Sequence, residues 1–328
     1  MLYVHGAGHF HPENVIDNHF LESLDIDTTD QWIVDRVGVH SRRTVLSLDY
    51  IRDTRNANPA DALDAAQYTN AQTGAHAGRE ALRRAGLSPA DIGMVVAGSC
   101  TPQFSCPAEA CTIAAELDID GPSLDINSAC SSLAAQVHLL NNMHPDALPD
   151  YVLVVNPDNS TPHIDYSDRN NCVLWGDGSA ALVVSPRAPA AMRIVNSSFT
   201  SQPAGWDKVQ FLPHGHFRQE GRTVQTFAIK RTIALIRSLG ENVDGHLKFI
   251  GHQANLTMLK SVCKRAGVEA DNHFFNVDEF GNCGAAGAPS VLSQHWNQFG
   301  AGDQLVVAVV GSGLSWGGML IDVQDTVQ

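Results

Sequence analysis

Short apolar runs alternate with alanine-rich segments of helical length along most of this 328-residue chain. The runs are rich in Val, Ile and Leu and are followed by Gly, Asn or Pro, which is typical of buried strands. Strands interleaved with helices of this length predict an α/β protein whose sheets are buried on both faces. The strands are expected at residues 94–98, 151–156, 180–185, 248–250 and 305–311. The helices are expected at residues 70–85, 107–117, 130–143, 224–239, 255–266 and 288–299.

The two parts of the chain contain similar sequence segments. A strand followed by a Gly-rich turn occurs at residues 174–178, and a similar turn recurs at 311–313. We therefore expect a duplicated α/β unit, with an N-terminal half at residues 1–190 and a C-terminal half at residues 191–328. Residues 200–223 contain several Pro and Gly and predict a long irregular loop, of the kind that often closes over or lines a binding site.

Composition argues against several classes of protein. The chain has 21 Lys and Arg against 35 Asp and Glu, a formal net charge of −14, whereas nucleic-acid binding needs a basic face. No apolar run approaches the ~18 residues of a membrane span, and residues 1–12 do not follow the pattern of a secretory signal. The seven cysteines form no paired Cys-x-x-Cys motifs, so neither disulfides nor a zinc site is expected and a reducing, cytoplasmic location is predicted.

Two groups of histidines are spaced loosely enough to suggest a metal site. They are His5, His9 and His11 near the start of the chain, and His214 with His216. No cysteine or carboxylate nearby in the sequence completes a recognisable ligand set for either group. We therefore expect no metal site.

Cys130 is the first residue that could carry chemistry. It follows a short apolar strand that ends in small polar residues, and an alanine- and leucine-rich helix is expected to begin at the cysteine itself. A thiol at a helix N-terminus is stabilised as the thiolate by the helix dipole and by unpaired N–H groups. The small neighbouring side chains would let a thioester carbonyl approach closely. A buried structural cysteine is the alternative interpretation.

Two further segments carry candidate helpers. His252 lies after a predicted strand and beside two amide side chains, where it could act as an acid, a base or a hydrogen-bond donor. Asn282 lies in a run of small residues that would let the backbone close tightly around a pocket. Each could instead be structural, a histidine bonded within the fold or an asparagine in a turn. With Cys130 they fit a cysteine nucleophile assisted by two other side chains.

Six segments, in this order along the chain, together resemble the ketoacyl-ACP synthase III branch of the thiolase-like condensing enzymes. The segments are residues 30–39 with Arg42 and Arg43, residues 127–130, 175–180, 252–255, 281–286 and 311–317. The resemblance covers nearly the whole chain. It implies a five-layered αβαβα architecture built from two similar halves, and a homodimer.

The resemblance also implies the chemistry, residue by residue. Cys130 would accept an acyl group from a thioester. His252 and Asn282 would then hold the oxygen of the extender thioester while it loses CO₂ and becomes an enolate-like carbanion. The backbone N–H groups of Cys130 and Ser312 would form the oxyanion hole, where each donor is typically worth ~10²–10³ in rate. CoA or phosphopantetheine thioesters would be substrates, and no bound cofactor is implied.

Four residues are expected to bind substrate. Trp32, with Arg36 beside it, would line the pantetheine tunnel or stack on a CoA base, and Asn255 would hydrogen-bond the pantetheine arm. The family's base-stacking arginine aligns with residues 162–163, a Pro-His pair, so a conventional adenine clamp is not expected. Cys106 stands where the family presents a bulky aromatic side chain to the partner subunit's acyl pocket. A smaller residue there predicts a wider pocket and an acyl group that need not be acetyl.

A basic rim is the last feature of the predicted site. Lys260 and Lys264 lie one turn apart on the helix expected after His252, and Arg265 is adjacent. Together with Arg36 these residues would steer an acidic acyl carrier protein toward the site, despite the net negative charge of the chain. A solvated helix face is the alternative.

The sequence therefore predicts a ketoacyl-ACP synthase III-like acyltransferase. It would join an acyl thioester to a malonyl- or β-ketoacyl-carrier thioester by decarboxylative Claisen condensation, in fatty-acid initiation or in specialised, polyketide-like metabolism. One alternative is transfer of the acyl group from Cys130 to an oxygen or nitrogen nucleophile, which releases no CO₂. The other is a non-catalytic subunit that scaffolds a partner, against which the presence of Cys130, His252 and Asn282 argues.

Overall fold

A ten-stranded mixed sheet forms the centre of the computed structural model, which describes residues 1–213, 215–241, 243 and 247–325. Its strands are β1 (Leu2–Phe10), β4 (Met94–Ala97), β5 (Ser123–Asp125), β6 (Val152–Asp158), β7 (Gly178–Ser185), β8 (Met192–Ser201), β11 (Leu247–Gly251), β12 (His273–Phe274), β13 (Gln304–Gly311) and β14 (Ser315–Val323). Two small two-stranded sheets are formed by β2 (Asn14–Asp17) with β3 (Ser41–Thr44), and by β9 (Val209–Gln210) with β10 (Arg218–Gln219). The helices are α1 (Asn18–Glu22), α2 (Asp30–Val37), α3 (Leu48–Thr54), α4 (Pro59–Ala65), α5 (Asn70–Ala85), α6 (Glu109–Glu116), α7 (Ser132–Asn142), α8 (Gly221–Leu239), α9 (Leu256–Ala266), α10 (Val277–Phe280) and α11 (Gly287–Gln294).

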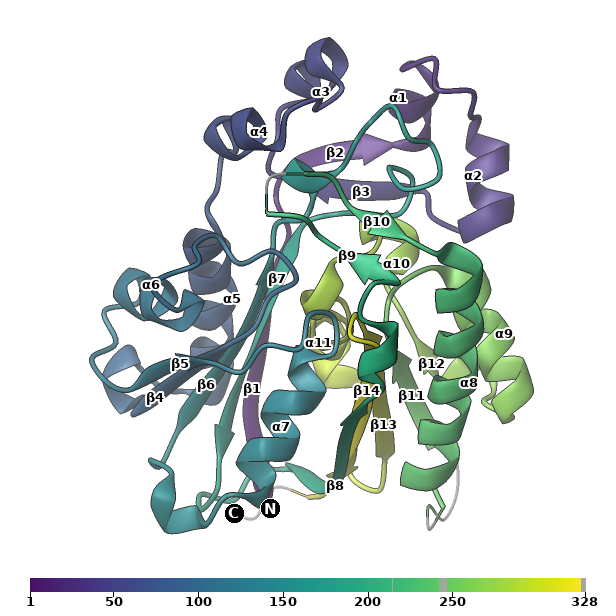
Figure 1. Cartoon of the computed structure of the whole chain (residues 1–328). Helices are drawn as coiled ribbons and strands as arrows, with labels where there is room; N and C mark the ends of the chain where they lie inside the picture. Colours follow the sequence, from purple (N-terminus) through teal and green to yellow (C-terminus); the bar gives the residue numbers. More distant parts are fainter. Residues whose placement is uncertain (214, 242, 244–246, 326–328) are drawn as a thin grey trace.

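The large sheet consists of two halves with the same topology (Figure 1). When the strands of each half are numbered in chain order, both halves have the spatial order 3-2-4-5-1. The first half is β5-β4-β6-β7-β1 and the second is β12-β11-β13-β14-β8. The halves join where β1 pairs antiparallel with β8. This repeat confirms the predicted fold of two similar α/β halves. A division into domains near residue 190 stays a prediction.

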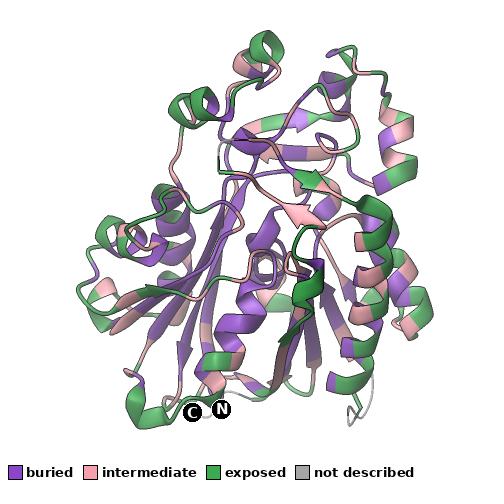
Figure 2. Ribbon diagram, viewed as in Figure 1, coloured by how far each residue is buried: buried purple, intermediate pink, exposed green. Residues whose placement is uncertain are grey.

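Helices cover the outer faces of both halves and also fill the space between them. α5 contacts β1, β6 and β7 on the outer face of the first half, and α8 contacts β13 and β14 on the outer face of the second. α7 contacts β6, β8 and β14, and α11 contacts β1, β7 and β11, so each of these two helices touches both halves (Figure 1). The layers are therefore helix, sheet, helix, sheet, helix, as predicted. Figure 2 shows that α7 and the strands around it are largely buried.

Local sequence signals explain why α5 begins and ends at its predicted residues. The side chains of Thr69 and Gln72 each accept a hydrogen bond from the other residue's N–H, which makes a capping box. The helix ends at Gly86, whose φ of 68° is easily adopted only by glycine. The helix then lies very close to β1, because a Cβ atom on Gly8 would be 2.0 Å from the carbonyl oxygen of Ala77.

The structure corrects several predicted elements. The helix expected to begin at Cys130 begins at Ser132, and the helix expected over 288–299 ends at Gln294. Among the strands of the large sheet, β1, β8, β12 and β14 were not predicted from the sequence. Residues 200–223 are less irregular than expected, since they contain the β9–β10 hairpin and the first turn of α8.

Candidate active site

Cys130 lies in a tight turn between β5 and α7. The turn requires a φ of 48° at Ala129, a left-handed conformation that costs a non-glycine residue about 1–3 kcal/mol. Two hydrogen bonds close it: Ser132 donates its N–H to the Ala129 carbonyl at 2.9 Å, and the Ser132 hydroxyl accepts the Ser128 N–H at 2.9 Å. The fold therefore maintains an unfavourable backbone conformation next to the candidate nucleophile.

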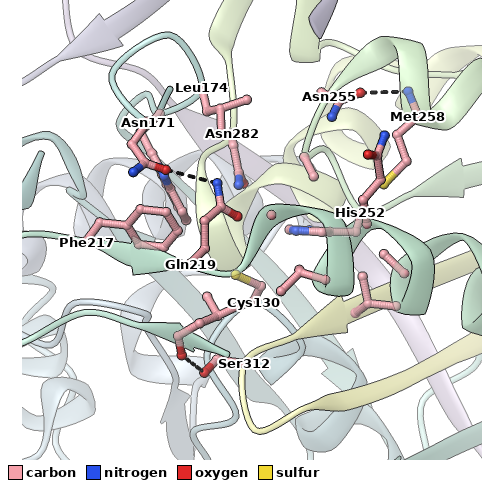
Figure 3. A pocket seen from close by; sticks show the side chains of 18 of the residues that line it. Cys130, Asn171, Leu174, Phe217, Gln219, His252, Asn255, Met258, Asn282 and Ser312 are labelled. Atoms are coloured by element: carbon pink, nitrogen blue, oxygen red, sulfur yellow. Dashed lines mark hydrogen bonds between the residues drawn. The ribbon is translucent and has the colours of Figure 1, made fainter. Parts of the chain in front are cut away.

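The three predicted catalytic side chains meet in one cavity (Figure 3). His252 follows β11, and Asn282 lies between α10 and α11, so both come from the second half, whereas Cys130 comes from the first. All three line a cavity of about 790 Å³, and Ser312 lines it as well. The structure thus brings together the four residues to which the sequence assigned the chemistry.

Asn282 is oriented by its own neighbours. Its N–H donates to the Leu174 carbonyl at 2.7 Å, and its carbonyl accepts the Gly176 N–H at 3.1 Å. Its side-chain Oδ1 accepts the N–H of Gly284 at 3.0 Å. Because the oxygen is occupied in this way, the NH₂ group is the part of the amide that remains to act as a donor in the cavity.

His252 is buried and is followed by a residue that fixes its loop. The neighbouring Gln253 accepts the N–H groups of Asn276 and Val277 at 3.1 and 3.2 Å, and it donates to the Gly251 carbonyl at 2.7 Å. Within the described residues the Nδ1 atom of His252 has no hydrogen-bond partner. The ring points into the cavity on the side of Cys130 (Figure 3).

The sulfur of Cys130 is 3.3 Å from the sulfur of Cys100, a residue that the sequence analysis did not single out. The hydrogen bond from Cys100, and then the hydrogen bond and charge of His252, together lower the pKa of Cys130 to about 5 against the opposing effect of burial. Burial, together with the contact to Cys130 and the nearby Asp158, raises the pKa of Cys100 well above its usual value. Cys130 is therefore a thiolate at neutral pH, and Cys100 is a thiol.

Ser312 is held beside Cys130 by serine hydroxyl groups. The hydroxyl of Ser315 donates to the Ser312 carbonyl at 2.7 Å and is 2.7 Å from the hydroxyl of Ser131. Gly311 makes the close approach possible, because a Cβ atom there would be 2.8 Å from the Ser131 nitrogen. In the part of the chain that the structure describes, the Ser312 N–H has no backbone or side-chain acceptor, so it is available to a bound oxygen atom.

Trp32 contacts two guanidinium groups, but contrary to expectation it does not itself line the cavity. Arg36 and Arg169 are each 5.0 Å from the centre of its ring. Arg36 lines the cavity, and Arg169 is also paired with Asp27 at 2.6 Å. Arg169 was not predicted from the sequence, because Pro162 and His163 occupy the positions where the family's base-stacking arginine aligns.

The other predicted substrate-binding and docking residues differ in whether they line the cavity. Asn255 lines the cavity, but its Oδ1 caps α9 by accepting the Met258 N–H at 2.6 Å. Cys106 is exposed and does not line this cavity. The remaining docking residues are exposed on α9 and do not line the cavity; they are Lys260, Lys264 and Arg265. Their contribution to carrier docking, like that of Cys106 to an acyl pocket, stays a prediction.

A second cavity, of about 380 Å³, lies on another side of Cys130. Cys130 and Ser312 line both cavities, and Cys100 lines only the second. Most of its other lining residues are apolar and come from the segment before and within the β9–β10 hairpin: Trp206, Val209, Phe211, Leu212 and Pro213. The predicted loop at 200–223 therefore does line a cavity next to the nucleophile.

Neither a metal cluster nor a membrane-spanning helix is found in the described part of the chain. No group of three or more His, Cys, Asp or Glu side chains is arranged to hold a metal ion there. His214, considered above with His216, lies outside the described residues. No described helix has both the length and the apolarity needed to cross a membrane.

Comparison with known proteins identifies the family. A family model described as 3-oxoacyl-[acyl-carrier-protein] synthase III matches residues 124–203, and the model of its C-terminal part matches residues 242–323. A beta-ketoacyl-[acyl-carrier-protein] synthase III of Oleidesulfovibrio alaskensis is 30% identical over 349 aligned residues, which cover 97% of this chain and 98% of the relative. The chain belongs to the beta-ketoacyl-[acyl-carrier-protein] synthase III family.

Solved structures of this synthase III family have the same fold over their whole length. The synthase III of Aquifex aeolicus superposes with a TM-score of 0.86 at 26% identity, covering 98% of this chain and 100% of the other. The enzyme of Pseudomonas aeruginosa gives a TM-score of 0.85 at 26% identity, covering 100% and 99%. Cys130 falls in the first segment matched by the family models, and His252, Asn282 and Ser312 fall in the second. Trp32 and Arg36 lie outside both segments.

Proposed function

We propose that this protein is a condensing acyltransferase of the synthase III type. It transfers an acyl group from an acyl-CoA or acyl-carrier thioester to Cys130, and then joins that group to a malonyl- or β-ketoacyl-carrier thioester with loss of CO₂. The observation that carries the proposal is the convergence of Cys130, His252 and Asn282 on one cavity, with the pKa of Cys130 lowered to about 5. A nucleophile that is already charged can attack a thioester without a separate base.

Each half-reaction has suitable hydrogen-bond donors. When the thiolate attacks the acyl thioester, the N–H groups of Cys130 and Ser312 stabilise the oxyanion of the tetrahedral intermediate. After the first thiol leaves, the extender thioester takes its place. The Asn282 NH₂ group and the His252 ring then donate to its carbonyl oxygen as the carboxylate departs as CO₂. The resulting enolate carbon attacks the acyl carbon on Cys130, and the Cys130 thiolate leaves to restore the free enzyme.

Each of the two cavities accommodates a different part of the substrate. The larger cavity contains His252, Asn282 and Asn255 and has Arg36 and Arg222 among its lining residues, which suits a polar pantetheine arm with a phosphate at its outer end. The smaller cavity is lined mainly by apolar side chains and suits the acyl chain. Cys130 lies where the two cavities meet, which is the position that an acyl-cysteine intermediate requires. No resident cofactor enters this scheme.

The active form is a homodimer that receives substrate from a carrier protein. β5 is an end strand of the large sheet, and the apolar side chain of Leu124 on it is 41% exposed. An uncovered apolar edge of this kind favours pairing with a second copy. Light scattering should give twice the chain mass of 35.3 kDa. The carrier would dock near Lys260, Lys264 and Arg265, and a cytoplasmic location remains the expectation.

A condensation assay tests the proposed function. Purified protein is given a panel of acyl-CoA donors together with malonyl-carrier protein labelled in its free carboxyl group. We expect release of labelled CO₂ and formation of a β-ketoacyl-carrier product, both lost in Cys130→Ala. The exposed Cys111 on α6 gives the matched control, since Cys111→Ala should retain both.

Other outcomes would overturn the proposal. Acyl transfer to an alcohol or amine without release of CO₂ would favour the second chemistry that the sequence left open. Failure of every donor to react would favour a non-catalytic subunit.

A further inference from the structure

Cys100 is placed against the nucleophile by the topology of the first half of the sheet. It lies after β4, and Cys130 lies after β5. β4 and β5 are parallel neighbours, so their carboxyl ends lie side by side. The two sulfur atoms are 3.3 Å apart, within the distance of an S–H hydrogen bond. Two cysteines that are 30 residues apart in the sequence thus touch at the reacting atom.

The charges around the two sulfurs decide which of them keeps the proton. Asp158, at the end of β6, lies beside Cys100 and accepts its backbone N–H at 2.9 Å. Cys130 instead has His252 as a second hydrogen-bonding neighbour. A neighbouring carboxylate disfavours a thiolate, whereas a donor favours one. The proton therefore stays on Cys100, and Cys130 carries the charge. The titratable groups acting on Cys130 are Cys100, His252 and Asp158.

The second half of the protein encloses this arrangement. A Cβ atom on Gly284 would be 2.9 Å from the Cys100 sulfur, so the segment that follows Asn282 closes directly over the thiol. The side chain of Asp158 also accepts the N–H of Ala285 at 2.5 Å. Cys100 therefore packs against Cys130, Asp158 and the Asn282 segment, and its remaining side faces the second cavity.

We propose that Cys100 is a further catalytic residue, whose S–H group hydrogen-bonds the Cys130 thiolate and keeps it charged for acylation. This inference rests on the proposed function, in which Cys130 is the nucleophile. In the acylation step the Cys130 sulfur bonds to the thioester carbon, the carbonyl electrons move to oxygen, and collapse breaks the bond to the leaving thiolate. That thiolate takes its proton from solvent. Cys100 keeps its own proton throughout.

The test is the pH profile of Cys130 alkylation by iodoacetamide, measured by peptide mass spectrometry. In wild type we expect the rate to rise with a midpoint near pH 5, the pKa set by this environment. Cys100→Ala removes the donor, so the midpoint should rise by at least about one pH unit and the rate at pH 6 should fall at least about twofold. The limiting rate at high pH should change little. Cys100→Ser keeps a hydroxyl donor and should fall between the two.

Two results would overturn the inference. The first is a Cys100→Ala profile that coincides with wild type. The second is an equal shift in Cys100→Ala and Cys100→Ser, which would mean that lost packing rather than the lost donor changes Cys130. If the alanine variant fails to fold, Cys100→Val replaces it, because valine has a similar volume and no donor. Cys111→Ala should reproduce the wild-type profile.

This measurement is independent of the proposed function, because alkylation needs no acyl donor. A shifted profile in a protein that accepts no acyl group would support the hydrogen bond from Cys100 to Cys130 but reject the proposed function, and with it a catalytic role for Cys100. Normal acyl loading with an unshifted profile would do the reverse.

Discussion

A Cβ atom on Gly284 would lie 2.1 Å from the Oδ2 atom of Asp158, so these two residues touch with no space for any side chain between them. Gly284 also has a φ of 53° and donates its N–H to Asn282. The contact joins the asparagine segment of the second half to the carboxyl end of β6 in the first. The position of the Asn282 amide therefore depends on a glycine two residues later.

Gly284→Ala is expected to destabilise the protein strongly. The substitution adds a clash with Asp158 to the cost of a left-handed φ, which alone is about 1–2 kcal/mol. Gly86 gives the matched control, because its φ is 68° and nothing lies within 4 Å of a Cβ atom there. Urea unfolding should show a loss of about 1 kcal/mol for Gly86→Ala and a loss of roughly 3 kcal/mol or more for Gly284→Ala. Equal losses would mean that the contact has no energetic importance.

Asn282→Ala should separate the two half-reactions. It removes the NH₂ donor from the cavity but leaves Cys130, Cys100 and His252 in place. We expect condensation to slow by roughly 10²–10³-fold, the usual effect of losing one such donor, while acylation of Cys130 changes by much less. Rapid-quench mass spectrometry and CO₂ release measure the two steps. Asn196→Ala, at an exposed position on β8, should change neither. Equal loss of both steps would contradict this assignment.

Arg169→Ala should weaken binding of CoA donors selectively. The guanidinium stacks on Trp32 at 5.0 Å, and a cation–π contact of this kind contributes about 0.5–2 kcal/mol. KM for an acyl-CoA should rise roughly 2- to 30-fold, with kcat little changed. KM for the matching acyl-pantetheine, which has no adenine, should not change. Arg237→Ala, exposed on α8, is the control. An equal rise for both donors would place the effect elsewhere in the site.

His11→Gln should make the protein less sensitive to acid. Burial lowers the pKa of His11 to about 3. Between about pH 3 and 6.5 the unfolded chain therefore binds a proton that the native protein does not. The free energy of unfolding falls as the pH drops through this window, by about 1.4 kcal/mol per pH unit. Glutamine can still donate to the Asp177 carbonyl, which His11 contacts at 3.1 Å.

Urea unfolding at several pH values between 4.5 and 6.5 checks this prediction. The slope of stability against pH should be shallower by about one proton in His11→Gln than in wild type. The exposed His144→Gln should keep the wild-type slope. Burial raises the pKa of Asp158 to about 7, so this group changes stability with pH in the opposite direction. Its effect is the same in all three proteins. An unchanged slope in His11→Gln would mean that His11 is not the group that takes up the proton.

The strands that could be predicted from the sequence are those with continuous apolar runs. β6 and β7 are buried along their entire length, and their residues are mostly apolar. β1 and β14 are also largely buried, but their sequences contain glycines at the places where other elements approach. Gly8 allows α5 to lie against β1, and a Cβ atom on Gly318 would be 2.4 Å from the Val307 carbonyl. These glycines allow close packing. They also interrupt the pattern of apolar residues by which a strand is recognised in a sequence, so neither strand was predicted.

The candidate site could be predicted where a motif marked it, as at Cys130, His252 and Asn282. Cys100 and Asp158 were missed, because no local pattern distinguishes them from other cysteines and aspartates. One signal could have revealed them. Both lie at the carboxyl ends of strands that are parallel neighbours in the structure, β4 and β6. The sequence predicted both strands but not their order in the sheet. Arg169 was missed because it lies in the loop between β6 and β7, and no sequence pattern indicated that this loop contacts Trp32.

The most direct test of the central claim is the intact mass of the protein after brief exposure to acyl-CoA donors of increasing chain length. We predict that at least one donor adds a single acyl group to wild type and to Cys111→Ala, and that the same donor adds nothing to Cys130→Ala. Adding malonyl-carrier protein should then remove the acyl group. An acyl adduct that persists in Cys130→Ala, or no adduct with any donor, would contradict the account.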